Sequence, residues 1–418
     1  MKQSLTLALV LLALSAFPAH ADEPDPAVDS GKVKAELSGY LETRHYGIFG
    51  HSTALEDKLT PLLTVLGKSF DDLGFHPSWS YGNTNRIRPT LKLRLGEKAS
   101  VVVTPEAHSQ HGFFGKSGDS VWDYISLERA YLTYTMDVFD FTVGKQVVAF
   151  GHGLLLNPTD LFLTRPPGDL RAEQPGVWAA KALFALTDAQ NLTFVAALRE
   201  EACCSPTLIA RYDLDHDAFD GSAMVAWRKA TEEVVFGLDL KGDVEVGLWA
   251  ESTFTLNTAD TSRWHFTVEG GLDYSFDVLS GWYFAIEWIY RGNGLEGGFG
   301  DAPASYLTES LTLDPKNRPQ LLGSQYFLFL SRLTIDAKWS LQVLNLLNVR
   351  DPSGTVVTQV TWLPKGYLEL TLGVNVNYGK TGGEYALTAP DSPMLPADVR
   401  GERLSPWVMV TLWGRFYF

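Results

Sequence analysis

The sequence predicts an all-β fold, a transmembrane antiparallel β-barrel of about 18 strands, with about 16 strands as the alternative. Three observations support this prediction. Apolar and polar residues alternate along most of the chain, the connections alternate between short and long, and the last segment, Val408–Phe418, keeps the alternation to its final residue. A tilted strand needs ~9–11 residues to cross a bilayer, and its alternating side chains face lipid and barrel interior in turn.

The predicted strands follow one another along the whole chain. They are Lys34–Tyr46, Asn85–Leu95, Ala99–His108, Ser126–Met136, Phe139–Ala149, Gly176–Leu186, Asn191–Arg199, Pro206–Leu214, Phe219–Arg228, Glu232–Leu240, Val244–Leu256, Trp264–Phe276, Trp282–Arg291, Gln325–Ile335, Lys338–Asn345, Thr355–Leu363, Gly366–Tyr378 and Pro406–Phe418. The count is even, as bacterial single-chain barrels require.

The connections predict which end of each strand lies on which side of the membrane. Every second connection is short and rich in turn residues: Gly96-Glu97-Lys98, Asp137-Val138, Thr187–Gln190, Lys241-Gly242-Asp243, Asp336-Ala337 and Pro364-Lys365. The intervening ones are often long: Gly47–Thr84, Ser109–Ile125, Phe150–Pro175, Gly292–Ser324 and Gly379–Ser405. Short periplasmic turns and long external loops are typical of a membrane barrel. A soluble all-β protein, the alternative, has no reason to keep this phase.

Charged residues at mid-strand are expected to face the barrel interior, because lipid exposure costs ~2–4 kcal/mol for each basic residue. The early strands supply pore-lining basic residues, and the later strands supply pore-lining acidic ones. The basic set is Arg86, Arg88, Lys92, Arg94 and Arg129, and the acidic set is Glu251, Glu269, Asp273 and Glu287. In a closed barrel this order predicts a basic wall opposite a more acidic one. The alternative is that neighbouring inward pairs neutralise each other.

The N-terminus predicts a secretory signal peptide at Met1–Ala21, with Lys2, an apolar stretch and the small-x-small site Ala19-His20-Ala21. An N-terminal membrane anchor is the alternative, although the apolar run is short for a span of ~20 residues. A short periplasmic lead, Asp22–Val33, and a barrel over Lys34–Phe418 are expected to follow. Because so little precedes the first predicted strand, a TonB-dependent transporter with its large plug is disfavoured.

The closing segment resembles the last strand of bacterial outer-membrane β-barrels. Val408, Val410, Leu412, Phe416 and Phe418 share one face of it. In that group the terminal aromatic residue is part of the signal read by the barrel-assembly machinery. The resemblance implies that Phe416 and Phe418 form an assembly signal.

A second resemblance covers about 35 residues of the chain. Leu127–Tyr131 … Gly144-Lys145-Gln146 … Phe150-Gly151 … Asn157-Pro158-Thr159-Asp160 resembles the G-[RK]-Q-x-x-x-[WF]-G … N-P-x-D stretch of porin-like outer-membrane proteins, some of them alginate-export-type channels. The resemblance implies a channel. Strict alternation places Lys145 on the lipid face, and a bulge near Gly144 or snorkelling at the rim would resolve this conflict.

The loop Phe150–Pro175 is expected to fold into the barrel. Its apolar run Leu154-Leu155-Leu156 is unsuited to an exposed external loop. Folding inward would make it a constriction that presents Asn157, Pro158, Asp160, Asp169 and Glu173. A loop packed over the rim is the alternative.

Composition excludes several other functions. The formal net charge of −15 disfavours binding to nucleic acid, and the adjacent pair Cys203-Cys204 offers no metal-ligand spacing. No catalytic constellation, metal or cofactor is predicted. The expected function is passive diffusion of small hydrophilic solutes across a cell outer membrane. The alternatives are a substrate-specific channel for an acidic oligosaccharide or other anion, and a barrel enzyme or adhesin. Expected partners are outer-membrane lipid, lipopolysaccharide and the barrel-assembly machinery, with a homotrimer as a further expectation.

Overall fold

A computed structural model describes residues 33–49, 60–61, 64, 80–111, 121–154, 157–163, 173–198, 205–216, 218–295, 321–379, 383–386 and 407–418. The predicted signal peptide, the cysteine pair and Asp169 lie outside these ranges, so the statements about them stay predictions. Among the described residues, no helix is both long enough and apolar enough to cross a membrane.

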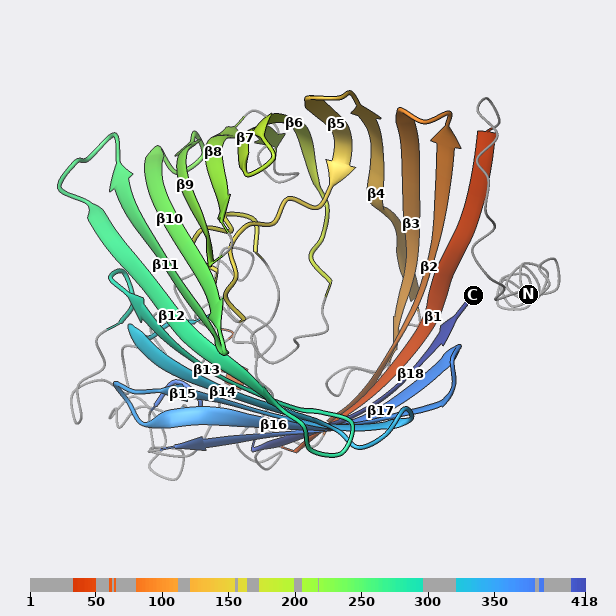
Figure 1. Ribbon diagram of the computed structural model, residues 1–418. Coiled ribbons are helices and arrows are strands. Elements are labelled where there is room, and N and C mark those ends of the chain that lie inside the picture. Colours follow the sequence, from red (N-terminus) through yellow and green to blue (C-terminus); the bar gives the residue numbers. More distant parts are fainter. Residues whose placement is uncertain are drawn as a thin grey trace.

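Eighteen strands form one sheet (Figure 1). Their bounds are β1 Val33–Phe49, β2 Ser80–Leu95, β3 Ala99–His111, β4 Val121–Thr135, β5 Phe139–Gln146, β6 Val177–Thr187, β7 Gln190–Leu198, β8 Pro206–His216, β9 Phe219–Arg228, β10 Glu233–Val244, β11 Val246–Asn257, β12 Trp264–Phe276, β13 Trp282–Arg291, β14 Gln325–Thr334, β15 Trp339–Asn348, β16 Ser353–Lys365, β17 Leu368–Gly379 and β18 Val408–Tyr417.

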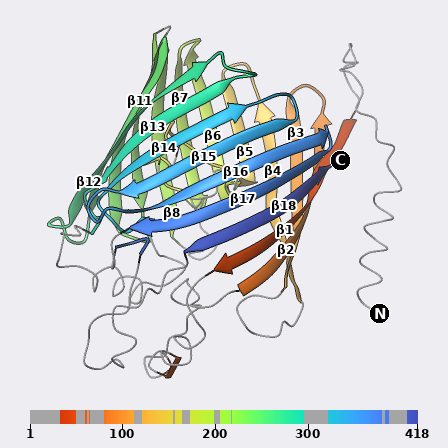
Figure 2. The same cartoon turned by 90° about the horizontal axis from the view of Figure 1, so that it is seen from below.

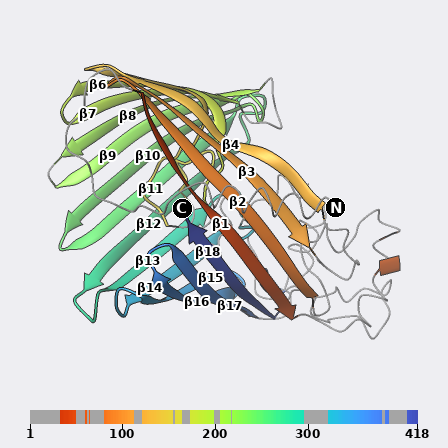
Figure 3. The ribbon, with the colours of Figure 1, turned by 90° about the vertical axis from the view of Figure 1, so that its right-hand side faces the viewer.

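The sheet closes on itself. Each strand pairs antiparallel with its neighbours in the sequence, and β1 pairs with both β2 and β18. In the β1–β18 seam Thr43 lies opposite Gly414, and ten residue pairs are in register from Tyr40–Tyr417 to Phe49–Val408. Figures 2 and 3 show β17, β18, β1 and β2 side by side in a continuous wall of tilted strands. Closure leaves no edge strand, whose unpaired backbone N–H and C=O groups would find no hydrogen-bond partner in lipid.

The predicted fold class is confirmed, including the count of 18 and the phase of the connections. We call the end with the long connections the loop end and the other the turn end. Three strands, Phe219–Arg228, Trp264–Phe276 and Trp282–Arg291, have their predicted bounds. The predicted turn at 241–243 is wrong, because β10 continues to Val244 and the chain reverses at Glu245, whose φ is 72°.

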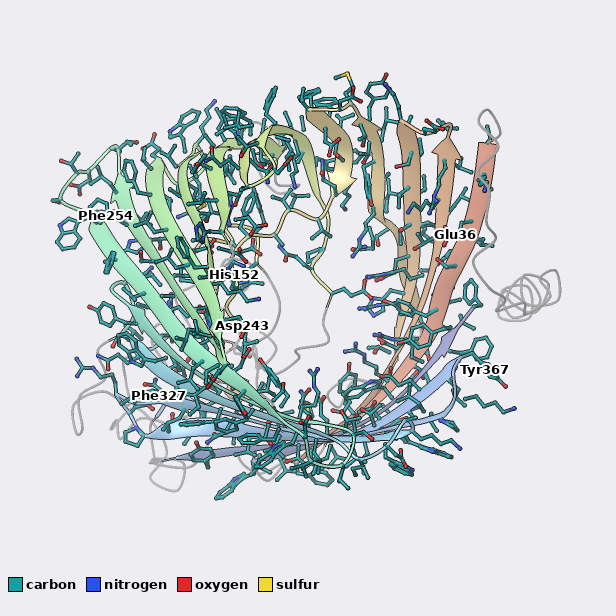
Figure 4. The ribbon with its side chains drawn as sticks, in the orientation of Figure 1. Glu36, His152, Asp243, Phe254, Phe327 and Tyr367 are labelled. Atoms are coloured by element: carbon teal, nitrogen blue, oxygen red, sulfur yellow. The ribbon has the colours of Figure 1, made fainter. Side chains whose placement is uncertain are left out.

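Alternation of exposure follows alternation of sequence. On β10, Phe236, Leu238 and Leu240 are 51–58% exposed, whereas Val235 and Asp239 at the alternate positions are each 1% exposed. Phe254 on β11 likewise lies on the outside of the ring in Figure 4. These outward apolar side chains form the face that a bilayer would cover.

The inward faces are not uniformly polar. One apolar cluster lies on β6–β10, and Phe150, Leu161 and Phe162 from the β5–β6 connection pack in it. A second cluster, which we call the inner-wall cluster, lies mainly on β13–β16. It comprises Trp249, Ala285, Ile289, Leu321, Tyr326, Leu328, Leu330, Leu344, Leu346 and Val357, with Leu154 and Tyr385 packed against it. The core of this barrel therefore sits inside it, between the strands and the segments that fold inward.

Candidate functional site

The β5–β6 connection, which we call the third loop, folds into the barrel. In Figure 1 the chain leaves β5 and runs inside the ring toward β8–β11, and Figure 4 shows His152 there. Leu154 packs on the inner-wall cluster and Phe162 is 3% exposed in the other cluster. The prediction of an inward third loop is confirmed for its described residues. Leu154 turns inward because the inner wall offers it an apolar surface.

Buried carboxylates on the strands hold the third loop by its backbone. Glu251 of β11 accepts hydrogen bonds from the amides of His152 and Gly153, the latter at 2.9 Å, and from the hydroxyl of Thr159 at 2.8 Å. Glu287 of β13 accepts a hydrogen bond from the amide of Leu154 at 2.6 Å. Charge-assisted bonds to carboxylates are among the stronger protein hydrogen bonds. Glu251 and Glu287 therefore hold this part of the loop through its backbone amides and the Thr159 hydroxyl.

Gly153 permits this close approach. A Cβ at this position would lie 1.8 Å from Oε1 of Glu269 and 2.5 Å from Oδ1 of Asn157, so any other residue would displace the loop. Glu269 of β12 also accepts a hydrogen bond from the indole of Trp249 at 3.3 Å. The ring of His152 lies 2.8 Å from the carboxylate of Asp239 on β10. The same carboxylate accepts a hydrogen bond from Arg211 on β8 at 2.7 Å.

The acidic side chains differ from the prediction in their exposure. Glu251, Glu269 and Glu287 point inward as the alternation predicts, but they are at most 1% exposed, because the third loop covers them. They contact the loop and do not line open space. Asp273 lies nearer the turn end of β12, half-buried, and accepts a hydrogen bond from the hydroxyl of Tyr283 at 2.9 Å.

The residues of the N-P-x-D stretch build the loop's own turn. The amide of Asp160 donates to the carbonyl of Asn157 at 2.9 Å, and Pro158 lies between them. Asp160 accepts from the amide of Phe162 at 3.0 Å and is 6% exposed. These residues shape the constriction from within, and Asp160 is buried where the sequence predicted a residue presented to solutes.

Glu173 ties the far end of the third loop to the opposite, arginine-rich side. Its carboxylate lies 2.5 Å from Nη1 of Arg88 and 3.6 Å from Nη2 of Arg129, and it accepts a hydrogen bond from the hydroxyl of Tyr40 at 3.2 Å. Arg88 also donates through Nε to Glu106 at 2.7 Å. The third loop is thus held on both sides of the barrel. On one side its backbone amides donate to Glu251 and Glu287, and on the other its Glu173 pairs with Arg88 and Arg129.

The predicted basic residues share the inward face of β2 and β4. Arg86 lies 3.3 Å from Glu106, and Arg94 lies 4.0 Å from Glu36 near the turn end. Lys92 stands opposite Glu36 in the register of β1 and β2. Arg88 has a 9% exposed side chain, whereas the side chains of Arg86, Arg129 and Arg94 are 29%, 35% and 57% exposed. The more exposed arginines are the ones a solute could meet.

Inward charges on β1 and β18 neutralise each other, as the alternative to two walls of opposite charge predicts. Glu42 is 5% exposed and pairs with Arg44 at 2.7 Å and with Arg415 through Nε at 2.9 Å. The guanidinium of Arg415 also stacks 4.5 Å above the ring of Tyr40. Strand alternation alone places all three charges on the inward face. Their pairing across the closing seam could not be read without the register.

Lys145 does not face lipid. Gly144 has a φ of 126°, and after it both Lys145 and Gln146 are buried, at 7% and 5% exposure. The broken alternation at Gly144 turns Lys145 away from the bilayer, as the expected bulge would. A Cβ at Gly144 would lie 2.2 Å from the carbonyl of Ala130, so this conformation also depends on glycine for space.

The C-terminal residue completes the seam. The amide of Phe418 donates to the carbonyl of Gly39 at 3.0 Å, and the amide of Gly39 donates back to the carbonyl of Phe418 at 2.9 Å. The ring of Phe416 packs edge-on against Tyr367 at 5.3 Å between centroids. The terminal residues therefore have a structural role in closure besides their predicted role as a signal.

Comparison with known proteins identifies the fold. No protein-family model matches the chain, and no curated protein sequence matches it. Among solved structures it is similar to OccK11 (OpdR) of Pseudomonas aeruginosa, with 11% identity, 92% of this chain and 96% of that chain covered, and a TM-score of 0.53. OccK5 (OpdH) of the same species is 9% identical, with 92% of this chain and 98% of that chain covered and a TM-score of 0.55. The outer membrane protein OprD of Pseudomonas aeruginosa is 8% identical, with 92% of this chain and 93% of that chain covered and a TM-score of 0.53. This chain therefore shares the closed 18-strand fold of outer-membrane porin structures.

Proposed function

We propose that this chain is an outer-membrane porin through which small hydrophilic solutes diffuse passively. The observation that carries the proposal is a closed barrel of 18 strands with one loop docked across its interior. Barrels of about 16–18 strands are wide enough to leave an aqueous channel. The likeness to solved porin structures supports the same function.

The arginine-rich side favours a second, narrower candidate, a substrate-specific channel for an acidic oligosaccharide or another anion. Arg86, Arg129 and Arg94 keep exposed side chains on this side, whereas the acids opposite are buried beneath the third loop. A polar wall of one sign raises the local concentration of solutes of the other sign. The path of a solute would then follow β1, β2 and β4.

Membrane location and partners follow as parts of the proposal. The predicted signal peptide and the terminal Phe418 support export and assembly in a cell outer membrane, in contact with lipid and lipopolysaccharide. Recognition by the barrel-assembly machinery and a homotrimeric state are proposed with it. Membership of the alginate-export type of porin rests only on the sequence stretch around Gly144–Asp160.

Reconstitution tests the function. Liposomes containing the purified protein should swell in neutral sugars with a rate that falls as solute size rises. In planar bilayers under a KCl gradient the reversal potential reports ion preference, and a uronic-acid oligomer should block the current only if the second candidate holds. A folded, heat-modifiable barrel that gives neither swelling nor current would reject both candidates and favour an enzyme or adhesin.

A further inference from the structure

A second segment folds against the inner wall at the loop end. Residues 383–386 lie in the connection between β17 and β18, and Ala386 is 1% exposed. Tyr385 packs against the inner-wall cluster, which Leu154 of the third loop also contacts. The two inward segments therefore rest on one apolar surface. The sequence Gly383-Glu384-Tyr385-Ala386 carries no pattern that predicts this placement.

One carboxylate anchors this segment. Oε1 of Glu384 accepts a hydrogen bond from the amide of Leu322 at 2.8 Å. Oε2 accepts from the hydroxyl of Tyr326 at 2.5 Å and from the side-chain amide of Asn348 at 2.8 Å. The three donors lie just before β14, in β14 and at the end of β15, where Tyr326 and Asn348 are register partners in one β-hairpin. A buried carboxylate with several donors is stable only where its environment is built for it.

The backbone of the segment is held as well. The amide of Glu384 donates to Asp351 at 2.6 Å, and the amide of Tyr385 donates to the hydroxyl of Ser353 at 3.2 Å. Ser353 and Asn348 are each fully buried. A Cβ at Gly323 would lie 2.3 Å from Nδ2 of Asn348 and 2.8 Å from the hydroxyl of Tyr326, so a larger residue there would disrupt the donors. The groups around the Glu384 carboxylate, the Leu322 amide, Tyr326 and Asn348, are therefore closely packed.

We infer that Glu384 is a positioning residue that holds residues 383–386 against the inner wall as a second narrowing element beside the third loop. The inference rests on the proposed porin function for its effect on transport. The contacts themselves do not depend on that function. Loss of the carboxylate would leave three buried donors without an acceptor, so the segment should leave the wall and the channel should widen at its loop end.

The anchor should also respond to pH. Burial raises the pKa of Glu384, against the lowering effect of its hydrogen bonds, and the nearby Asp351 raises it further. The docked segment therefore binds a proton more tightly than the released one, so docking is strongest in acid and weakens as pH rises through the raised pKa. The titratable and charged groups that face this site are Arg291 of β13, Tyr326 of β14, Asp351 of the β15–β16 turn, Tyr378 of β17 and Tyr385.

Two substitutions test the anchor. Glu384→Ala should raise single-channel conductance at both pH 5 and pH 8. The parent protein should conduct at a lower level than Glu384→Ala at both values, and any change in the parent from pH 5 to pH 8 should be a rise. Glu384→Gln keeps one acceptor oxygen but places an amide donor where Glu384 has its second oxygen, so its conductance should lie between those of the parent and Glu384→Ala. A Glu384→Ala conductance equal to that of the parent at both values, or a parent conductance that falls from pH 5 to pH 8, would overturn the inference.

A second readout does not depend on transport. Hydrogen exchange of the peptides containing Leu322 and residues 383–386, measured at one pH in folded barrels, should be at least ten-fold faster in Glu384→Ala than in the parent. If exchange accelerates but no variant conducts, the anchor stands and the porin proposal fails. If exchange is unchanged, the anchor is rejected. Should Glu384→Ala fail to fold, Tyr385→Ala, which removes the ring that packs on the inner-wall cluster, gives the same comparison.

Discussion

Glu173 of the third loop places its carboxylate 2.5 Å from the guanidinium of Arg88 on β2. The two residues are 85 positions apart in the sequence, and each has a further role. Arg88 also neutralises the buried Glu106, whereas the side chain of Glu173 is 33% exposed. Glu173 is therefore the acid of this group that both holds the loop and reduces the positive charge that a solute would meet.

Replacing Glu173 should shift ion preference toward anions. Glu173→Gln removes one negative charge beside Arg88 and Arg129. A unit charge at ~8 Å in water contributes about 0.5 kcal/mol, with opposite sign for an anion and a cation, which is about six-fold in the anion-to-cation permeability ratio. The reversal potential in a KCl gradient measures this ratio. Glu97→Gln, in the turn between β2 and β3, is the matched control and should leave it unchanged. A Glu173→Gln channel with the parental ratio would mean that ions do not pass this group.

Arg88 and Arg129 should separate stability from selectivity. Arg88→Gln removes the closer partner of the buried Glu106 and leaves it with Arg86 at 3.3 Å. Breaking a buried pair outright costs about 3–5 kcal/mol, so we expect a loss of stability below that range. Arg129→Gln removes a half-exposed pair at 3.6 Å, worth about 0–1 kcal/mol. We expect Arg88→Gln to lower the urea midpoint of unfolding. We expect Arg129→Gln to shift ion preference toward cations and to keep a near-parental midpoint. Equal loss of stability in both would show that the two arginines are equally structural.

The barrel could be predicted closely because its determinants are local. Alternation along each strand and the order of short and long connections fix both strand count and phase, as β9, β12 and β13 show with their predicted bounds. A one-residue slip would turn every lipid-facing side chain inward, so the pattern is under strong physical constraint. The β10–β11 reversal at Glu245 was missed because Lys241-Gly242-Asp243 carries the turn residues and Glu245 does not.

The interior could be predicted only in part. Alternation indicates that Glu251, Glu269 and Glu287 point inward, but whether an inward side chain meets water depends on where the loops fold. The loop contacts these acids mainly through backbone amides, which every residue except proline carries. No side-chain pattern in residues 152–154 therefore predicts the contact. Glu384 illustrates the same limit, since its partners Leu322, Tyr326 and Asn348 lie on or next to the β14–β15 hairpin, whereas Glu384 reaches them from the connection that follows β17.

Loosening the third loop should enlarge the channel. Glu251→Ala leaves the amides of His152, Gly153 and Thr159 and the hydroxyl of Thr159 without their acceptor, at about 1–3 kcal/mol for each buried group. We expect higher single-channel conductance, a larger size cutoff in liposome swelling and noisier current. Asp260→Asn, on an exposed turn between β11 and β12, is the control.

Gly153→Ala provides an independent route to the same state. Its new Cβ would overlap the carboxylate of Glu269, so the loop and this side chain must move apart although every carboxylate remains. Agreement between the two variants would assign the effect to loop position and not to lost charge. Parental conductance in both would place the narrowest point of the channel elsewhere. Excision of residues 155–171 with a Gly-Ser closure should exceed either substitution in its effect.

The C-terminal residue should act at two separable steps, insertion and closure. Deleting Phe418 removes the ring of the predicted assembly signal and also both backbone hydrogen bonds to Gly39, each worth about 0.5–1.5 kcal/mol. Phe418→Ala removes only the ring, which is 42% exposed, and keeps the backbone bonds.

In cells both variants should yield less heat-modifiable barrel in outer membranes and more periplasmic degradation. After refolding from urea into detergent, where no assembly machinery acts, Phe418→Ala should regain near-parental stability, while the deletion should unfold at lower denaturant. Normal cellular assembly of Phe418→Ala would contradict the signal role, and parental stability of the refolded deletion would contradict the role of this residue in the β1–β18 seam.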